Sequence, residues 1–258
     1  EVIAEVLEEN PEHQDTLELL KLVDKAEAEE VPADLPSVPA AEDVRIVRLE
    51  KLQHGKKFDE VVKESDKMLD AGETTLGQRV IASILKGEAL ACQGQFEQAD
   101  TLYKAAEESY RYIYRAIAGR GITAAARERW DDAEKLFHLS LQLKPTHDVA
   151  LAGLGICATA RGDRTKAFEF YRQALQNNPE NQRALLGLIE HAYPLQRLEE
   201  LEIALVRHLE YSPANLSILY AYAGCAYAQG KMELATEQLQ KILLFDPQHE
   251  LALELIQK

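Results

Sequence analysis

Four prolines, Pro145, Pro179, Pro213 and Pro247, follow one another at a spacing of 34 residues. Each proline closes a segment whose apolar residues are spaced as in two short amphipathic helices. A fixed period of this size indicates stacked copies of one unit, because each copy needs its neighbours to bury its apolar face. The sequence therefore predicts an all-α fold, an α-solenoid of antiparallel helix pairs.

Aligning the copies so that the proline is position 32 of each shows which residue types recur. Position 8, in the first helix, and position 20, in the second, are mostly small, which allows the two helices to approach closely. Position 8 reads Gly87, Gly121, Gly155, Ile189 and Ala223, and position 20 reads Ala99, Ala133, Ala167, Leu201 and Ala235. The five copies are 80–113, 114–147, 148–181, 182–215 and 216–249.

Three segments carry a resemblance to a known family: GQFEQADTLYKAA (94–106), WDDAEKLFHLSLQLKP (130–145) and ALAGLGICATARGDRTKAFEFYRQALQNNP (150–179). They resemble the tetratricopeptide repeat (TPR) in length and in residue type at nearly every diagnostic position. The resemblance covers residues 80–249. It implies a right-handed superhelix that binds proteins or peptides in a concave groove lined by the first helices.

The chain before this array is less regular. Residues 1–13 resemble the second half of a repeat, so residues 1–25 are expected to form a partial repeat, with more chain upstream of it. Residues 26–43 contain three prolines and several acids, which predicts a linker. We expect a solvated spacer; the alternative is an extended strand lying along the array's own groove.

A degenerate repeat is expected over 44–79, with a second helix from Phe58 to Leu69. Because Phe58 and Phe96 are 38 residues apart, about four residues are inserted, and we assign them to a loop at 71–78. Residues 250–258 are expected to form a helix that caps the last repeat.

The net charge of −15 is concentrated in the N-terminal arm, since residues 1–43 hold fourteen acidic residues and two lysines. The remaining chain has 30 acidic against 27 basic residues. Without a basic excess to neutralise phosphates, nucleic acid is not expected as a partner. No apolar run approaches the ~20 residues that span a bilayer, so direct membrane insertion is not expected either.

The three cysteines, Cys92, Cys157 and Cys225, lie in the first helices of different repeats. Their odd number and wide spacing argue against a disulfide framework or a zinc site, and we expect three buried thiols. That expectation slightly favours the cytoplasm. A periplasmic location stays open, because a leader peptide could have been removed.

The histidines do not form a catalytic or metal-binding pattern. His13, His147 and His249 recur two residues after a proline, where Asn181 and Asn215 stand in other repeats, which predicts capping or turn roles. The spacing that a metal site needs is missing around the other repeat histidines, His138, His191 and His208. With no phosphate loop, nucleophile elbow or Cys–His pair either, the sequence predicts no enzyme, cofactor, metal or small-molecule substrate.

The family resemblance implies that positions 2, 5, 9 and 12 of the first helices line the groove. Positions 5 and 9 hold no lysine or asparagine, so the carboxylate-clamp type of co-chaperone TPR is not expected. The lining is mostly apolar and aromatic, with a few charges that would set the register of a ligand. The expected partner-binding residues are Ile84, Glu88, Arg115, Ile122, Val149, Ile156, Arg183, Leu186, Glu190, Tyr193, Tyr220 and Tyr227.

Repeat 182–215 departs most from the pattern. Ile189 and Leu201 are large where small residues are expected, and Pro194 should end the first helix near Ala192. We therefore predict that this helix pair is more open than its neighbours, with Tyr193, Tyr220 and Tyr227 around the deepest apolar part of the groove.

Two functions follow from these observations. The first is a non-catalytic interaction scaffold that binds an apolar or amphipathic peptide or helix in the groove. The alternative is a segment of a larger regulatory or assembly protein that forms a homo-oligomer or docks on a domain of its own chain.

Overall fold

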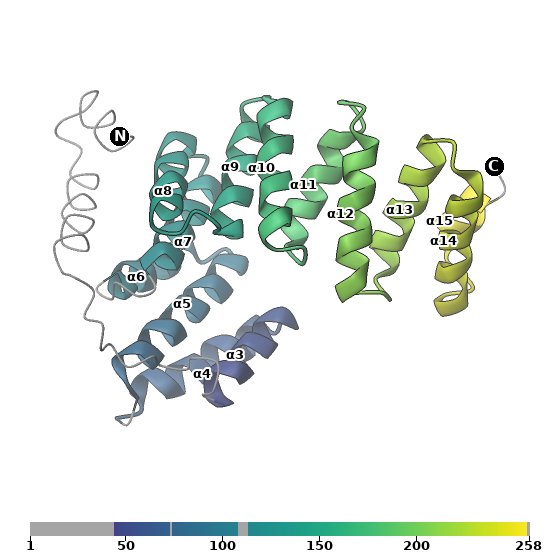
Figure 1. Ribbon diagram of the computed structural model, residues 1–258. Coiled ribbons are helices and arrows are strands. Elements are labelled where there is room, and N and C mark those ends of the chain that lie inside the picture. Colours follow the sequence, from purple (N-terminus) through teal and green to yellow (C-terminus); the bar gives the residue numbers. More distant parts are fainter. Residues whose placement is uncertain (1–43, 73, 108–112, 257–258) are drawn as a thin grey trace. The chain divides into compact units, whose positions relative to one another are not determined.

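The computed structural model describes residues 44–72, 74–107 and 113–256, and every regular element among them is a helix (Figure 1). The expected partial repeat at 1–25 and the expected linker at 26–43 lie outside these residues. The helices are α3 (Val44–His54), α4 (Phe58–Asp70), α5 (Leu76–Cys92), α6 (Phe96–Ala106), α7 (Ile113–Ala126), α8 (Trp130–Leu143), α9 (Asp148–Ala160), α10 (Arg164–Asn177), α11 (Gln182–Ala192), α12 (Leu198–Tyr211), α13 (Leu216–Ala228), α14 (Met232–Phe245) and α15 (Glu250–Ile256).

The described helices belong to two compact units, which meet in the sequence between Pro145 and Thr146. Unit 1 contains α3 to α8, and unit 2 contains α9 to α15. Within each unit, a helix packs mainly against the helices before and after it in the sequence. This nearest-neighbour packing is that of the α-helical solenoid that the 34-residue period predicts.

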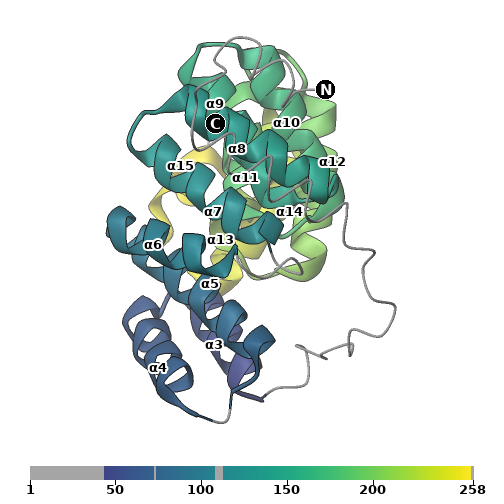
Figure 2. The same cartoon turned by 90° about the vertical axis from the view of Figure 1, so that its left-hand side faces the viewer.

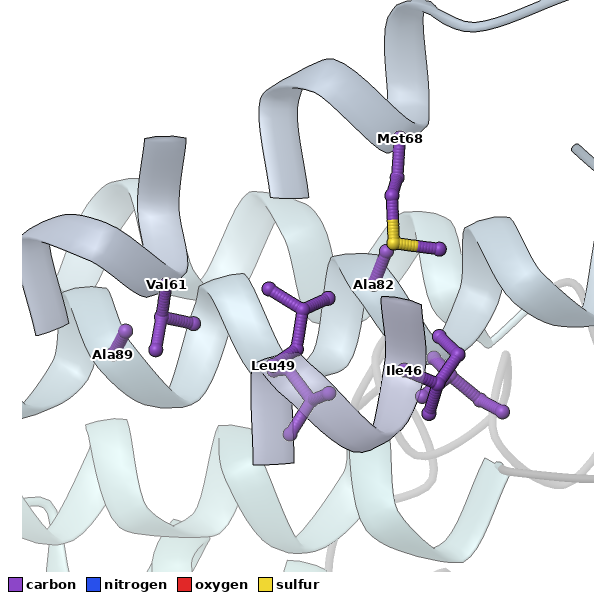
Figure 3. Close-up of a cluster of buried hydrophobic side chains, with 8 residues drawn as sticks. Ile46, Leu49, Val61, Met68, Ala82 and Ala89 are labelled. Carbon is purple, nitrogen blue, oxygen red and sulfur yellow. The ribbon is translucent and has the colours of Figure 1, made fainter. Parts of the chain in front are cut away.

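The first three helices of unit 1, α3, α4 and α5, share one hydrophobic core. Figure 3 shows Ile46 and Leu49 from α3, Val61 and Met68 from α4, and Ala82 from α5 meeting in this cluster. In Figure 2, α3, α4 and α5 lie side by side, as their packing against one another requires. The degenerate sequence of α3 and α4 is therefore sufficient to build a helix pair on α5.

The loop expected at 71–78 is shorter than predicted, because α5 begins at Leu76. Thr75 accepts a hydrogen bond from the Gln78 amide, and the Gln78 side chain accepts one from the Thr75 amide. This capping box starts the helix about one turn before the aligned repeat begins. The four inserted residues thus lengthen α5 instead of forming loop.

A large aromatic ring fills the space that small residues leave between two helices. A Cβ atom added to Gly155 of α9 would lie 2.5 Å from the ring of Tyr171, and one added to Gly187 of α11 would lie 2.4 Å from the same ring. The Tyr103 ring lies in the same way between Gly87 and Gly119. These glycines are needed because the ring occupies the place where a side chain would begin.

The turns between paired helices require a left-handed backbone. Gly94, Gly162 and Gly230 have φ angles of 78°, 76° and 75° at the equivalent turn position. Two other repeats place Glu128 and Gln196 there, with φ angles of 60° and 56°. The turn conformation is therefore kept even where the sequence lacks the glycine that favours it.

Helix caps follow the predicted pattern in part. The side chains of Asn181 and Asn215 accept hydrogen bonds from the third amide of α11 and α13. His249 Nδ1 accepts one from the Ala252 amide at the start of α15. His147 is likewise the N-cap residue of α9, but its side chain makes no cap hydrogen bond, so of the two roles expected, capping or turn, side-chain capping does not apply.

The α11–α12 pair is less tightly packed than the α9–α10 and α13–α14 pairs, as predicted. As expected from Pro194, α11 ends at Ala192. Leu201 is nevertheless fully buried at the position where other repeats have alanine. The larger side chains at this interface thus keep α11 and α12 apart, and the early end of α11 accommodates them.

Candidate partner-binding surfaces

The expected groove residues of unit 1 do not form an open apolar surface. Ile84 is fully buried in a cluster with Tyr103 of α6 and Ala116 of α7. It therefore cannot contact a partner, and its assignment as a binding residue is corrected here. Packing of α7 against α5 covers this position of the first helix. Ile122 is half-buried.

The charged groove residues of unit 1 are paired with each other. Arg115 Nη2 lies 2.9 Å from Glu88 Oε1, and both side chains are about one quarter exposed. The neighbouring Glu88 carboxylate raises the pKa of Arg115. This pair links α5 to α7, so a partner that used either charge would first have to compete with the internal ion pair.

Beneath this pair, the Tyr103 hydroxyl is buried and has no hydrogen-bond partner within the described residues. Burial raises its pKa well above the usual value, and the charge of Glu88 adds to the shift. The equivalent hydroxyl of unit 2, on Tyr171, lies 3.3 Å from Thr159 Oγ1. In unit 2, Thr159 near the end of α9 thus gives the tyrosine hydroxyl a hydrogen-bond partner. In unit 1 the equivalent residue is Ala91, which has no hydroxyl to offer Tyr103.

A polar chain joins α9, α10 and α11 in unit 2. Thr159 Oγ1 lies 2.8 Å from His191 Nε2, and the His191 ring stacks on Tyr171 with their centroids 6.0 Å apart. His191 and Tyr171 are both buried, so this chain positions helices and does not face solvent. Of the expected binding residues on α9, Val149 is exposed and Ile156 is half-buried.

The exposed apolar side chains of α11 and α13 form the most open part of the expected groove. Leu186 is 63% exposed, while Tyr193 and Tyr227 are 36% and 37% exposed. A Cβ atom on Gly224 would lie 3.5 Å from the Tyr193 hydroxyl, so the end of α11 lies over the middle of α13. We call the surface formed by Leu186, Tyr193, Tyr220 and Tyr227 the tyrosine face.

The tyrosine face continues toward α15. Tyr220 is half-buried, and its ring centroid lies 6.0 Å from that of His249, the residue before α15. Burial raises the pKa of Tyr193, and Cys225 and Tyr220 lie close enough to add to the shift. The Tyr193 phenol is therefore neutral at physiological pH. Each tyrosine of the face offers both an apolar ring and a hydroxyl that can form a hydrogen bond.

Two charged residues border the tyrosine face. Arg183 and Glu190, on α11, are both exposed. No ion pair or hydrogen bond of either side chain is found in the described part of the chain, in contrast to the Glu88–Arg115 pair of unit 1. Both charges are thus available to a ligand of opposite charge.

Sequence reasoning missed an ion-pair cluster on the opposite helices of unit 2. Arg197 contacts Glu169 of α10 and donates to Glu200 of α12 at 2.5 and 2.6 Å, with its guanidinium 4.2 Å from the centre of the Phe168 ring. The signal was present as a lone arginine in the turn before α12. Glu200, three residues further along the chain, could have been identified as a partner from the sequence, but Glu169 lies on α10 and could not.

The structure also bears on the expectations for the cysteines, for metal binding and for membrane insertion. Cys157 and Cys225 are buried as predicted, but Cys92 is exposed because it is the last residue of α5. In the residues that the structure describes, no group of three His, Cys, Asp or Glu side chains could hold a metal ion. None of the described helices is both long and apolar enough to cross a membrane.

Comparison with known proteins agrees with the helix-pair architecture. Residues 119–182 match the family model of the tetratricopeptide repeat. A search of curated proteins by sequence finds no match.

Among solved structures, PilF of Pseudomonas aeruginosa is 14% identical, with a TM-score of 0.56 over 83% of this chain and 95% of that one. A chain in the structure of the APC/C hetero-tetramer Cut9–Hcn1 is 18% identical, with a TM-score of 0.55 over 99% of this chain and 51% of that one. YrrB, described as a TPR protein with an unusual peptide-binding site, is 19% identical with a TM-score of 0.49, covering 75% of this chain and 98% of that one.

Because these identities are low, the solved structures establish the fold alone. The family is identified by sequence only within residues 119–182. The buried small residues at position 20, the left-handed turns and the paired helices are what the repeat requires. The chain thus carries a tetratricopeptide-repeat match over residues 119–182, within a helical solenoid of the same fold.

Proposed function

We propose that this protein is a non-catalytic interaction scaffold and that the tyrosine face of unit 2 binds an apolar or amphipathic segment of a partner protein. The observation that carries the proposal is the exposure of Leu186, Tyr193 and Tyr227 on two neighbouring first helices. Grouped exposed apolar side chains of this size are typical of protein interaction sites.

The chemistry of the tyrosine face favours a helix or peptide with one apolar side. Tyrosine rings bury a large apolar area with few rotatable bonds, and their hydroxyls can pair with a partner's backbone. Arg183 and Glu190 lie seven residues apart on α11, so they would contact the ligand about two helical turns apart. They would fix its direction, while the apolar contacts supply most of the affinity.

A partner can be captured by placing a photo-reactive amino acid, p-benzoylphenylalanine, at the Tyr227 position of the full chain. The same probe at the exposed Gln173 position of α10 serves as the control. The partner cross-linked only from the Tyr227 position would then be purified and its affinity measured by calorimetry.

The deciding measurement is the affinity of that partner for Leu186→Glu. Because Leu186 is 63% exposed, the substitution should leave the fold intact, yet it would place a charge in the centre of the apolar contact. We expect binding to weaken at least tenfold. Leu76→Glu, at an equally open leucine of unit 1, should leave it unchanged. Equal affinity of wild type and Leu186→Glu would contradict the proposal.

A second candidate function, self-association or docking on another domain of a larger protein, is favoured by the apolar surface at the end of unit 2. Leu244 and Phe245 of α14 are 82% and 65% exposed, and Leu251 and Leu253 of α15 are 52% and 38% exposed. Sedimentation velocity tests self-association. A mass that rises with concentration in the wild type but not in Phe245→Glu would support it, and a wild-type monomer at all concentrations would exclude it.

A further inference from the structure

A pocket lies between α10 and α12, on the second helices of unit 2 and away from the tyrosine face. Its volume is about 130 Å³, and its lining combines the apolar residues Leu175, Pro179, Ile203 and Ala204 with the polar residues Arg172, Gln176, Glu200 and Arg207. A cavity of roughly 150 Å³ is large enough to bind benzene. The pocket can therefore hold one side chain of the size of leucine or phenylalanine.

The sequence of repeat 182–215 explains why the pocket is open. Ala204 stands at position 23, where the other four repeats place the larger side chains Leu102, Leu136, Phe170 and Gln238. Shortening that side chain to a methyl group leaves space beside Leu175 of α10. The pocket is thus built by a substitution specific to this repeat.

The surface around the pocket is apolar, whereas the equivalent surfaces on the second helices of the other repeats are polar. Ile203, at position 22, is 61% exposed, while the other repeats have Thr101, Lys135, Glu169 and Glu237 at this position. Val206, at position 25, is 38% exposed, where the other repeats have Lys104, His138, Arg172 and Gln240. Two exposed β-branched residues one turn apart therefore extend the apolar surface beyond the pocket.

The two walls of the pocket are held in place by bonds near each end. Near one end, Arg197 joins Glu169 of α10 to Glu200 of α12. Near the other end, His208 Nδ1 of α12 donates to the Pro179 carbonyl oxygen at 2.8 Å. The pocket is therefore part of the folded structure and does not depend on a ligand to keep α10 and α12 apart.

The charges at the rim are unequally matched. Arg172 lies 2.8 Å from Glu169 and 3.8 Å from Glu200, so its charge is shared within the protein. Arg207 is exposed and makes no ion pair with any residue that the structure describes. Its counterpart on α14, Lys241, is paired with Glu237 at 2.8 Å. The rim thus presents one uncompensated positive charge next to an apolar opening.

We propose that this pocket is a second docking site, which receives one leucine-sized apolar side chain of a partner protein with a carboxylate next to it. The apolar side chain fills the space beside Ala204, and the carboxylate pairs with Arg207. Because the pocket lies on α10 and α12, such a partner does not compete for the tyrosine face on α11 and α13.

The test is an NMR titration of the full chain with three acetylated tripeptide amides: aspartate–leucine–aspartate, lysine–leucine–lysine and aspartate–alanine–aspartate. The side-chain methyl signals of Leu175, Ile203 and Ala204 report on the pocket. We expect the acidic leucine peptide to shift these signals and to bind about two- to fivefold more tightly than the basic one, the range of an exposed ion pair. The alanine peptide should bind much more weakly.

Two variants restore what neighbouring repeats already carry, so both should fold normally. Ala204→Leu fills the pocket with the residue of α6 and α8, and Ile203→Glu gives the rim the residue of α10 and α14. Each should abolish the methyl shifts. Arg207→Glu should remove the preference for the acidic peptide, whereas Lys241→Glu, at the equivalent position of α14, should keep it.

Unchanged binding by Ala204→Leu would overturn the proposal, as would shifts confined to the tyrosine face. The outcome is independent of the function proposed for that face, because Ala204→Leu leaves Leu186, Tyr193 and Tyr227 in place. A partner of the tyrosine face should bind Ala204→Leu as it binds the wild type.

Discussion

The close approach between Gly155 and Tyr171 predicts that a single methyl group destabilises unit 2. A Cβ atom at Gly155 would lie 2.5 Å from the Tyr171 ring, a distance that real Cβ atoms essentially never show. The ring cannot retreat, because its other side faces Gly187, where an added Cβ would lie 2.4 Å away. Gly155→Ala must therefore displace α9 from α10.

The magnitude follows from two opposing contributions. Overpacking a close contact costs about 1–3 kcal/mol, while alanine is more favourable than glycine inside a helix by about 1 kcal/mol. Gly155→Ala should thus lower the free energy of unfolding by up to about 2 kcal/mol. In a Tyr171→Leu background only the helix preference remains, so the same substitution should stabilise the protein.

Other repeats of this chain show the same relation. Where position 24 is leucine, as at Leu205 and Leu239, position 8 carries a side chain, Ile189 or Ala223. Where position 24 is aromatic, position 8 is glycine. The smaller Leu205 therefore provides room for Ile189, in addition to the room that the early end of α11 leaves.

The assay is urea unfolding of the four proteins of the double-mutant cycle, followed by circular dichroism at 222 nm. We expect a coupling energy of roughly 1–3 kcal/mol between Gly155 and Tyr171. Gly224→Ala is the control, since its added Cβ would meet only the Tyr193 hydroxyl, at an ordinary 3.5 Å. An equal effect of Gly155→Ala in both backgrounds would refute the reasoning.

Three further outcomes follow from the structure. Ala91→Thr should stabilise unit 1 by about 1 kcal/mol in urea unfolding, because its hydroxyl can pair with the buried Tyr103 hydroxyl; Ala91→Val, which has no hydroxyl, should give no gain. Hydrogen bonds from two arginines lower the pKa of Glu169, so its stabilising contribution is present above the unfolded pKa of 4.5 and is lost as the pH falls through the folded one. In Glu169→Gln, the loss of stability on acidification should be smaller; a loss equal to that of the wild type would contradict this. Burial raises the pKa of Glu107. The stabilising contribution of this carboxyl group is therefore present below the unfolded pKa of 4.5 and is lost as the pH rises through the folded pKa. Glu107→Gln should remove this decrease in the free energy of unfolding with rising pH.

The fold could be predicted because it depends on a repeated pattern of residue sizes. The proline period and the small residues at position 20 identified the helix pairs, and Pro194 correctly predicted the end of α11 at Ala192. The start of α5 was misplaced because a local capping box at Thr75 overrides the register of the repeat.

Exposure at the candidate site could be predicted less well. Whether a residue at a lining position faces solvent depends on the neighbouring repeat, and α7 buries Ile84 although the equivalent Leu186 is exposed. The Glu88–Arg115 pair likewise arises between two helices. The pocket beside Ala204 could have been suspected from the sequence, had position 23 been compared across the repeats as position 8 was.

The loose packing of α11 against α12 has a consequence for how this protein unfolds. In a repeat array, cooperativity is carried by the contacts between adjacent helices, so a weak contact allows the parts on either side to open separately. The segment from α12 to α15 can thus exchange its amide hydrogens in events that leave α9, α10 and α11 protected. Both proposed docking sites use residues from each side of this contact, so a bound partner would join the two parts into one cooperative unit.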